Sequence, residues 1–529
     1  MSSSTSGPPI RNDTQSASVR IVLLAGSDAR SWLADDANLE LWRSLHARCA
    51  WGTTFQSADY FCVWLRNYVE SWSPLLVLGL DDRSGLVGLF PLVVKERVIT
   101  GGGAHQAEYH GWLADSHCPG EFFKDAVAGV LKEFPDHELR LRYLPPGAPK
   151  DAVAALVSGD RRAFAQSEDR PLLGLDEADI NETLKKKGNR SKINRLKRLG
   201  AYSVRKMEAD EFERRIDEIA VMCDFRQGAV NDSCPFTDDV LKRPFHLDWV
   251  RSMPHEVHVN GMFIGDELIS VLIFALSKGE AHIAITAHSP AHSDNSPGKI
   301  HIYEAALALG REGYSLVDMT PGGDEWKSRF ATTTDKVVEL TVFASTRKAA
   351  LVRLRRVVGS NLRSVIARGQ AVYASLRARP ARATDDAKQG AGEFATYSPN
   401  LDGRAINAAA GDDVRVNALA DLLKHGPAAT GQNRQTFLSR ALTRMEAGDR
   451  CYSLLGHNGL DGLCWSGGDK TIVRLSDFSI SAGVDVRRAY AALVQRAASD
   501  LAAEARVSLP LNPVLQSVVE GLGFQRIPD

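Results

Sequence analysis

The chain has 529 residues, of which 44% are hydrophobic and 24% are charged, and its 64 basic and 65 acidic side chains give a net charge of −1. This composition is ordinary for a soluble globular protein, and the balanced charge gives no general reason to expect a nucleic-acid partner. At roughly 150 residues per domain, the length suggests about three domains. The seven scattered cysteines lack CxxC spacing and indicate reduced thiols rather than a disulfide framework.

Residues 1–18 form a polar tail, which we expect to be disordered. The apolar run IVLLAG at 21–26 is far too short for a signal-peptide core or a membrane span. No later segment approaches the roughly 20 apolar residues that a membrane helix needs. The sequence therefore predicts a cytoplasmic protein, with peripheral attachment at the inner face of the membrane as an alternative.

Three segments of the chain repeat one order of predicted elements. Residues 19–170 give a strand, two helices, a hairpin, a helix and a strand. Residues 171–345 end with three consecutive strands, a helix and a strand, and residues 413–529 repeat that order. We therefore predict three related units of α/β (α+β) class, each with a mixed, mostly antiparallel sheet flanked by helices.

Two connecting segments lie between the second and third units. Residues 346–378 are predicted to form a basic amphipathic helix, with Leu351 and Leu354 among the residues that face inward. Residues 379–412 are rich in Ala, Gly, Pro and Asp and show no periodicity, which is typical of a flexible linker.

The start of the helix after the third strand of the middle unit has the composition of an anion site. Ser296 is a good N-cap residue, Pro297 suits the first helical position, and Gly298 lets a ligand approach the backbone. Unpaired N–H groups and the positive end of the helix dipole favour a negatively charged group there, and Lys299 adds a charge. The alternative is a well-capped helix without a ligand.

A second polar segment follows the next strand. VDMTPGGDEWKSRF, residues 317–330, places Asp318, Asp324 and Lys327 around a Pro-Gly-Gly turn at the carboxyl end of a strand. Charges of both signs on such a turn suit a functional site better than a core. The alternative is structural: Asp318 caps the short helix that follows or pairs with Lys327.

The order of elements resembles the GNAT acyltransferases, and residues 50–345 resemble the acetyltransferase-like domain of CelD-type cellulose-biosynthesis proteins, distant relatives of the FemAB ligases. The stretches that carry the resemblance include WGTTFQSADYFCVWL, NRSKINRLKRLGAYSV, GDELISVLIFAL and SPGKIHIYEAALALGREGYSLVDMTPGGDEWKSRFA. The last is the most specific. The resemblance implies an acyl-CoA-dependent transferase that uses acetyl-CoA as co-substrate.

The resemblance also implies roles for individual residues. The pantetheine would pair with backbone near Ala284 and Ile285, and the pyrophosphate would bind at residues 296–299. An amine must lose a proton before it attacks a thioester, so a base is needed. The candidate bases are Asp318, Asp324 and, third, His282. Trp326 stands where relatives tend to have a tyrosine acid, so either Lys327 is the acid or this copy has weakened chemistry.

Four histidines of the middle unit, His282, His288, His292 and His301, raise the question of a metal. No cysteine or carboxylate spacing completes a site around them, so we predict no metal.

Two stretches are strongly basic. Residues 184–206 carry ten Lys and Arg and no acid, and residues 344–382 carry ten more. The commonest explanation is a solvated helix face. The functional alternatives are an anionic acceptor near 185–198, such as a lipid-linked or nucleotide sugar, and an anionic membrane surface at 347–368. Few aromatic residues interleave with the charges, so nucleic acid is not expected.

In the third unit, GVDVRR at the corresponding helix start offers one glycine and a carboxylate that would repel an anion. We therefore expect a degenerate copy there and a non-catalytic half in residues 19–170. The leading hypothesis is an acyl-CoA-dependent N- or O-acyltransferase of polysaccharide or cell-envelope synthesis, acting on a small-molecule, glycan or lipid-linked acceptor. The alternatives are a FemAB-type aminoacyl transferase and a catalytically inactive scaffold.

Overall fold

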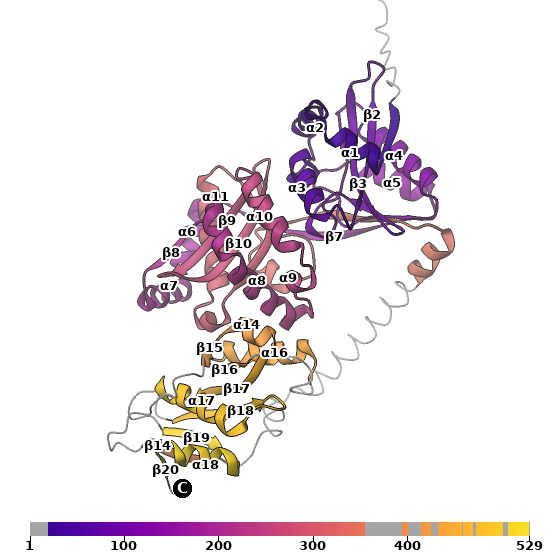
Figure 1. Cartoon of the computed structure of the whole chain (residues 1–529). Coiled ribbons are helices and arrows are strands. Elements are labelled where there is room, and N and C mark those ends of the chain that lie inside the picture. The colour runs from indigo at the N-terminus through magenta and orange to yellow at the C-terminus, as the bar shows by residue number, and fades with distance from the viewer. Residues whose placement is uncertain are drawn as a thin grey trace, which may run out of the picture. The chain divides into compact units, whose positions relative to one another are not determined.

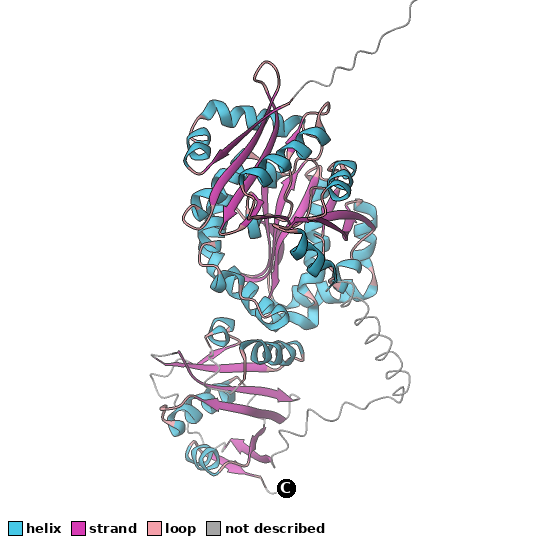
Figure 2. Ribbon diagram, turned by 90° about the vertical axis from the view of Figure 1, so that its right-hand side faces the viewer, coloured by secondary structure: helices cyan, strands magenta, loops and turns pink. Residues whose placement is uncertain are grey.

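The computed structural model describes residues 19–354, 394–399, 414–424, 432–456, 459–468, 472–500 and 506–527. The chain divides into two compact units, the first of residues 1–172 and 319–363 and the second of residues 173–318 and 364–529 (Figure 1). The predicted tail at 1–18 lies outside the described residues, as do most of the predicted basic helix and most of the predicted linker. In each unit, helices flank the strands (Figure 2).

In the first unit, the strand order is β1-β2-β3-β4-β6-β13-β7, and the short β5 pairs with β3. The strands are β1 (Arg20–Ala25), β2 (Ser73–Leu80), β3 (Leu86–Lys95), β4 (Val98–Gly101), β5 (Leu113–Ala114), β6 (Glu138–Leu141), β7 (Ala163–Gly174) and β13 (Thr333–Val342). The helices are α1 (Ser27–Leu33), α2 (Asp36–Arg48), η1 (Thr54–Gln56), α3 (Ala58–Tyr68), η2 (Ala104–Gln106), α4 (Pro119–Glu133), α5 (Lys150–Gly159) and α12 (Glu325–Ser328).

Strand β13 changes the predicted domain boundary. The sequence placed it at the end of a middle domain that runs to residue 345. In the structure, β13 pairs antiparallel with β7 along its whole length, from Thr333↔Leu172 to Val342↔Ala163, and its last three residues also pair with β6. Because these ladders satisfy its backbone, β13 belongs to the first unit, which includes residues 319–363.

The helix that begins the predicted basic segment spans residues 346–354 in the described part of the chain. Leu351 and Leu354 were expected to face inward, but their side chains are 47% and 60% exposed. Ala349 is instead fully buried, and Arg353 donates a hydrogen bond to the carbonyl of Ala163. Residues four apart share a helix face, so Ala349 and Arg353 turn both leucines outward.

The second unit begins with a middle module whose strand order is β12-β11-β10-β9-β8. Its strands are β8 (Tyr202–Lys206), β9 (Val257–Ile264), β10 (Glu267–Ser277), β11 (Glu280–His288) and β12 (Leu316–Asp318). Its helices are α6 (Glu177–Lys185), α7 (Lys187–Leu199), α8 (Ala209–Asn231), α9 (Pro235–Asp238), α10 (Lys242–Ser252), η3 (Pro290–Asn295) and α11 (Pro297–Arg311). Leu196 of α7 and Ile300 of α11 share one buried cluster with strand residues Met262 and Ile269.

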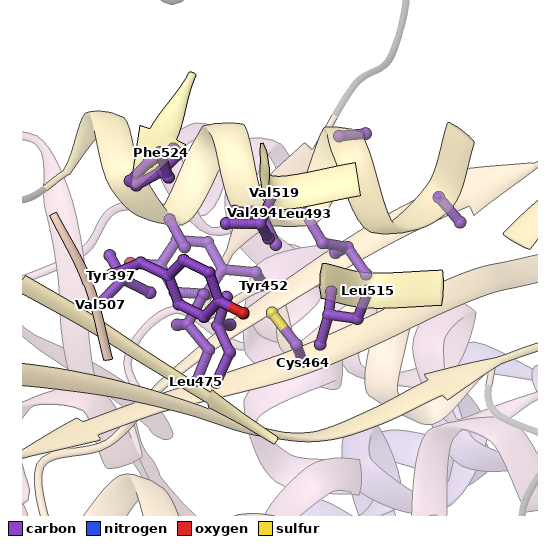
Figure 3. Close-up of a cluster of buried hydrophobic side chains, with 14 of the residues drawn as sticks. Tyr397, Tyr452, Cys464, Leu475, Leu493, Val494, Val507, Leu515, Val519 and Phe524 are labelled. Atoms are coloured by element: carbon purple, nitrogen blue, oxygen red, sulfur yellow. The ribbon is translucent and has the colours of Figure 1, made fainter. Parts of the chain in front are cut away.

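The C-terminal module has the strand order β15-β16-β17-β18-β19-β14-β20. Its strands are β14 (Phe394–Pro399), β15 (Val414–Val416), β16 (Arg450–Gly456), β17 (Gly459–Gly468), β18 (Ile472–Ile480), β19 (Arg506–Pro510) and β20 (Phe524–Arg526). Its helices are α14 (Leu419–Leu423), α16 (Arg434–Glu446), α17 (Val486–Ser499) and α18 (Pro513–Gly521). Helices α17 and α18 contribute Leu493, Val494 and Val519 to a buried core (Figure 3).

Strand β14 lies inside the segment predicted to be a linker. It pairs antiparallel with β19 and with β20. Its Ala395 and Tyr397 are buried in the C-terminal core, where Figure 3 shows Tyr397. Two buried residues at alternate positions are typical of a strand, but the surrounding polar sequence hides so short an alternation.

All three modules repeat one arrangement: antiparallel strands, then a helix, then a strand parallel to the last of them. The parallel pairs are β4 with β6, β11 with β12, and β18 with β19, and the intervening helices are α4, α11 and α17. The predicted fold class is therefore confirmed as mixed α/β with tandem GNAT-like modules.

All seven cysteines are free thiols, and six of them are buried. Of the helices in the described part of the chain, none has both the length and the apolarity that crossing a membrane requires.

Candidate functional site

The N-terminus of α11 is not capped by a side chain. Ser296 occupies the N-cap position in a left-handed conformation, with φ 47° and ψ 56°, and makes no side-chain cap hydrogen bond. The expectation that Ser296 caps the helix is therefore wrong. Its hydroxyl instead accepts a hydrogen bond of 2.5 Å from the Lys192 ammonium of α7. The hydroxyl thus leaves the first N–H groups of α11 to another acceptor.

Gly298 is required by its contact with His288. A Cβ atom at residue 298 would lie 2.7 Å from Nδ1 of His288, closer than van der Waals contact allows. The opposite ring nitrogen, Nε2, lies 3.3 Å from an Nη of Arg226, which can donate to it. Burial, and then the Arg226 charge, lower the pKa of His288 to about 3, so the ring is neutral at physiological pH.

Three cations from two helices surround this helix start. Besides Lys192, Arg195 of α7 donates a hydrogen bond to the backbone oxygen of Asp294, and Lys299 is exposed in the first turn of α11. Burial, followed by the charges of Lys299 and Arg195, lowers the pKa of Lys192. The helix start is therefore a region of concentrated positive charge.

Strands β11 and β12 are paired over only three residues. Their parallel ladder ends at His282↔Asp318, whereas β11 continues to His288. A register shift against β10 leaves Ala284 without a partner in that ladder, and Ala284 is exposed between the buried Ile283 and Ile285. A β-bulge bends its strand and re-aims the residues beside it. The two predicted pantetheine contacts, Ala284 and Ile285, thus lie at the bulge, just past the last paired residue.

His282 and Asp318 form a buried pair at that last paired position. Nδ1 of His282 lies 2.9 Å from Oδ2 of Asp318, and the two residues are 1% and 0% exposed. When Asp318 is ionised, it accepts the Nδ1–H of the neutral ring, and the lone pair of the imidazole is then on Nε2. The structure brings together two residues that the sequence offered as separate candidate bases.

Sequence reasoning missed a third member of this cluster, Glu280. One donor atom each from Glu280, His282 and Asp318 lies within 4.8 Å of the others. Residues two apart on a strand point to the same face, so the Glu-x-His spacing of β11 was the available signal. An imidazole and two carboxylates are donors that a divalent cation accepts. However, Nδ1 of His282 is within hydrogen-bond distance of Asp318, an arrangement that suits a proton-transfer pair.

Asp324 and Lys327 lie in the turn after β12 and have mainly local contacts. The Lys327 ammonium donates to the backbone oxygens of Thr320 and Pro321 and to the Thr320 hydroxyl, at 3.1 to 3.2 Å. It also lies 3.4 Å from a carboxylate oxygen of Asp324, whose side chain is 58% exposed. Through these contacts Lys327 stabilises the turn. Trp326, at the position of the expected tyrosine, packs edge-on against Phe330.

In the C-terminal module a side chain fills the helix start, and in the first unit hydrogen bonds join the chain beyond the parallel strands, although the start of α4 there also lacks a side-chain cap. At the start of α17, the Asp485 carboxylate accepts the N–H groups of Arg487 and Arg488, at 3.0 and 3.2 Å. In the first unit, beyond the β4–β6 pair, the backbone N–H of His110 donates to the oxygen of Tyr143, and the His110 ring accepts from Arg142. Asp485 thus occupies the place an anion would take.

Residues 185–328 match the model of the acetyltransferase (GNAT) domain family. A search of curated proteins found no match. Similar solved structures include FemX, with 9% identity and a TM-score of 0.42 over 59% of this chain and 98% of that one. L-PGS from Bacillus licheniformis has 10% identity and a TM-score of 0.40 over 60% and 96%. A tandem GNAT protein from the clavulanic acid biosynthesis pathway has 12% identity and a TM-score of 0.34 over 62% and 99%.

At these identities and scores, the fold assignment depends on the strand order and on the matched segment. That segment contains the uncapped start of α11, the bulge of β11 and the His282–Asp318 pair. The middle module is therefore a GNAT-like domain. The CelD-type resemblance stays a prediction.

Proposed function

We propose that the middle module is an acyl-CoA-dependent acyltransferase, with acetyl-CoA as the donor and an amine or hydroxyl as the acceptor. The observation that carries the proposal is the contrast between modules: the α11 start has no side-chain cap, whereas the α17 start is filled by Asp485. Free N–H groups and nearby cations suit a pyrophosphate, and the bulged β11 edge suits an extended pantetheine arm.

In the proposed reaction, the acceptor nitrogen or oxygen attacks the carbonyl carbon of the thioester. Its proton passes to Nε2 of His282, the bond from carbon to nitrogen or oxygen forms, and the carbon–sulfur bond breaks. The departing thiolate takes up a proton, so the products are the acylated acceptor and the coenzyme thiol. Asp318 acts as a positioning residue, because its carboxylate fixes the tautomer of His282 and stabilises the protonated ring.

Isothermal titration of the full chain with acetyl-CoA tests the proposal. We expect one site per chain, in the middle module, because Asp485 fills the start of α17 and hydrogen bonds join the chain beyond the β4–β6 pair in the first unit. Absence of binding would refute the assignment as an acyl-CoA-dependent acyltransferase and favour the alternative of a catalytically inactive scaffold. An acceptor screen by mass spectrometry should then detect an added acetyl group on a small-molecule, glycan or lipid-linked amine or hydroxyl. Polysaccharide or cell-envelope precursors are the first class to screen.

A FemAB-type aminoacyl transfer is the second candidate, and one observation favours it. Helix α7 carries six Lys and Arg and no acid, and such a surface also suits the phosphates of an RNA acceptor stem. Aminoacyl-tRNA would then replace acetyl-CoA as the donor. Turnover that requires charged tRNA, and does not occur with acetyl-CoA alone, would decide for this candidate.

A further inference from the structure

Helices α4 and α5 lie side by side in the first unit (Figure 1). A cavity of about 640 Å³ lies between them. Its walls are apolar, with Val127 and Leu131 from α4 and Ala155 and Leu156 from α5. The volume is within the range of sites that bind small molecules. The proposed reaction, which takes place in the middle module, makes no use of this cavity.

Two lysines of α4 stand along the cavity. Lys124, Ala128 and Lys132 follow one another at intervals of four residues, so they share one side of the helix, and all three are exposed and line the cavity. Of the described residues in this lining, Asp160 is the one acid, and the guanidinium and backbone N–H of Arg162 donate to its carboxylate. The charges of Lys124 and Lys132 are therefore not balanced by a free acid in the lining.

The described part of the basic segment is anchored next to the cavity wall. Arg162 lines the cavity, and its backbone oxygen accepts the N–H of Phe343. The carbonyl of the next residue, Ala163, accepts a hydrogen bond of 2.6 Å from Arg353. The helix at 346–354 thus begins and stays at the same end of the first unit as the cavity.

The outward face of this helix has the composition of a helix that lies on a membrane surface. Leu351 and Leu354 are 47% and 60% exposed, and the exposed Arg347 and Lys348 precede them. The described helix carries three basic side chains and no acid. Exposed leucines beside basic residues bind at the boundary between anionic head groups and acyl chains.

An apolar cavity with cations beside it is complementary to an acyl chain that ends in an anionic group. A sugar or a nucleotide base would need polar partners that these walls do not offer. We propose that the α4–α5 cavity binds one acyl chain of an anionic membrane lipid, with the lipid phosphate at Lys124 and Lys132, and that Leu351 and Leu354 insert into the surface of the same membrane. This second site lies in the first unit and does not depend on the proposed function.

A fluorescent fatty acid, cis-parinaric acid, tests the cavity on the full chain. We expect saturable binding at one site. The A155W variant fills the cavity and should weaken binding about 10-fold or more, whereas the matched control A154W should stay within about 3-fold of wild type. Ala154 and Ala155 are adjacent and both exposed on α5, and of the two it is Ala155 that lines the cavity. Because both are exposed, neither substitution disturbs the core.

Flotation of the full chain with vesicles tests whether the lipid comes from a membrane. Phosphatidylcholine vesicles that contain about one-third phosphatidylglycerol should bind the chain, and vesicles of phosphatidylcholine alone should not. The K124Q/K132Q variant should bind the anionic vesicles roughly 10- to 30-fold more weakly, because two lysine charges are lost. The L351Q/L354Q variant should also weaken binding by about 10-fold or more, because it removes the inserted apolar side chains.

The charge control is R30Q/R83Q, which removes two exposed cations of the first unit that do not line the cavity and should change vesicle binding less than about 3-fold. Binding of the fatty acid without binding of anionic vesicles would overturn the inference, because the ligand would then be a free fatty acid. Vesicle binding that is unchanged in A155W would also overturn it, because the basic surface alone would explain the attachment. Absence of both kinds of binding would overturn it as well, and none of these outcomes affects acetyl-CoA binding in the middle module.

Discussion

Nδ1 of His282 lies 2.9 Å from Oδ2 of Asp318, at the last position where β11 and β12 are paired. Both side chains are almost completely buried. The parallel register of the two strands creates this contact between residues 36 positions apart. A carboxylate that holds an imidazole in one tautomer is a recurring device of enzymes that move protons.

The D318N variant should fold and bind acetyl-CoA with nearly wild-type affinity but turn over on the order of 100-fold more slowly. The amide side chain introduced at residue 318 cannot stabilise the protonated His282 ring, and it can hold the neutral ring in the other tautomer. Steady-state kinetics and calorimetry on the same preparation measure the two effects. The control is D324N, since Asp324 is exposed and pairs with Lys327, and its turnover should stay within about 3-fold of wild type. Wild-type turnover in D318N would remove the pair from the mechanism.

The G298A variant should weaken acetyl-CoA binding by about 10-fold or more, because the added methyl group would lie 2.7 Å from the His288 ring. G298E adds a negative charge at the phosphate position and should abolish binding. The control variant is G159A, because no atom lies within 4 Å of a Cβ at residue 159. Calorimetry measures all three variants, and unchanged affinity in G298E would refute the phosphate assignment.

The K327M variant should lose stability by about 1–3 kcal/mol in urea unfolding, because Lys327 donates hydrogen bonds to three oxygens of the turn after β12. Those acceptors would lose the ammonium donor in a partly buried turn. If Lys327 were instead the acid for the leaving thiolate, turnover would fall and stability would not. Comparing the change in stability with the change in turnover distinguishes a structural role of Lys327 from a role as the acid.

The unfolding free energy should fall on acidification from pH 7 to pH 5. Burial, and then the Lys242 charge, lower the pKa of His246 to about 3. Between the unfolded pKa near 6.5 and about 3, the unfolded chain binds a proton that the folded chain does not, so stability decreases as the pH falls. One such histidine accounts for about 2 kcal/mol between pH 7 and pH 5.

The H246F variant isolates the contribution of His246 to the pH dependence of the unfolding free energy. The ring packs among Phe236, Phe245 and Trp249, so a phenyl group keeps the aromatic contacts. It loses the hydrogen bond from Nδ1 to the oxygen of Lys242 and is therefore less stable at both pH values. The difference between its unfolding free energies at pH 7 and pH 5 should be smaller than that of the wild type by about 2 kcal/mol. If the change in unfolding free energy between pH 7 and pH 5 were the same in H246F and in the wild type, His246 would not be the cause of the pH dependence.

A chelator should leave turnover unchanged. The cluster of Glu280, His282 and Asp318 has donors that suit a divalent cation, but the proton-transfer role needs Nδ1 of His282 to donate to Asp318. Activity lost in EDTA and restored by a divalent ion would replace the base mechanism with a metal-assisted one.

Local patterns predicted much of the fold because they depend on residues close in the chain. Apolar periodicity gave the repeated order of strands and helices, and Ser-Pro-Gly marked the start of α11. Periodicity failed where partners were distant. β13 was assigned to the wrong unit, and β14 was taken for linker, since strand pairing is set by residues far away in sequence.

The sequence by itself determined that the protein has three α/β modules and that candidate charges lie at the end of β12 and at the start of α11. Only the tertiary structure decided which of them meet. It joined Asp318 to His282, left Lys327 to the turn, and directed two cations of α7 to a helix start more than 90 residues further along the chain. The reason is that a side chain's partners are set by strand register and helix packing, which no local spacing encodes.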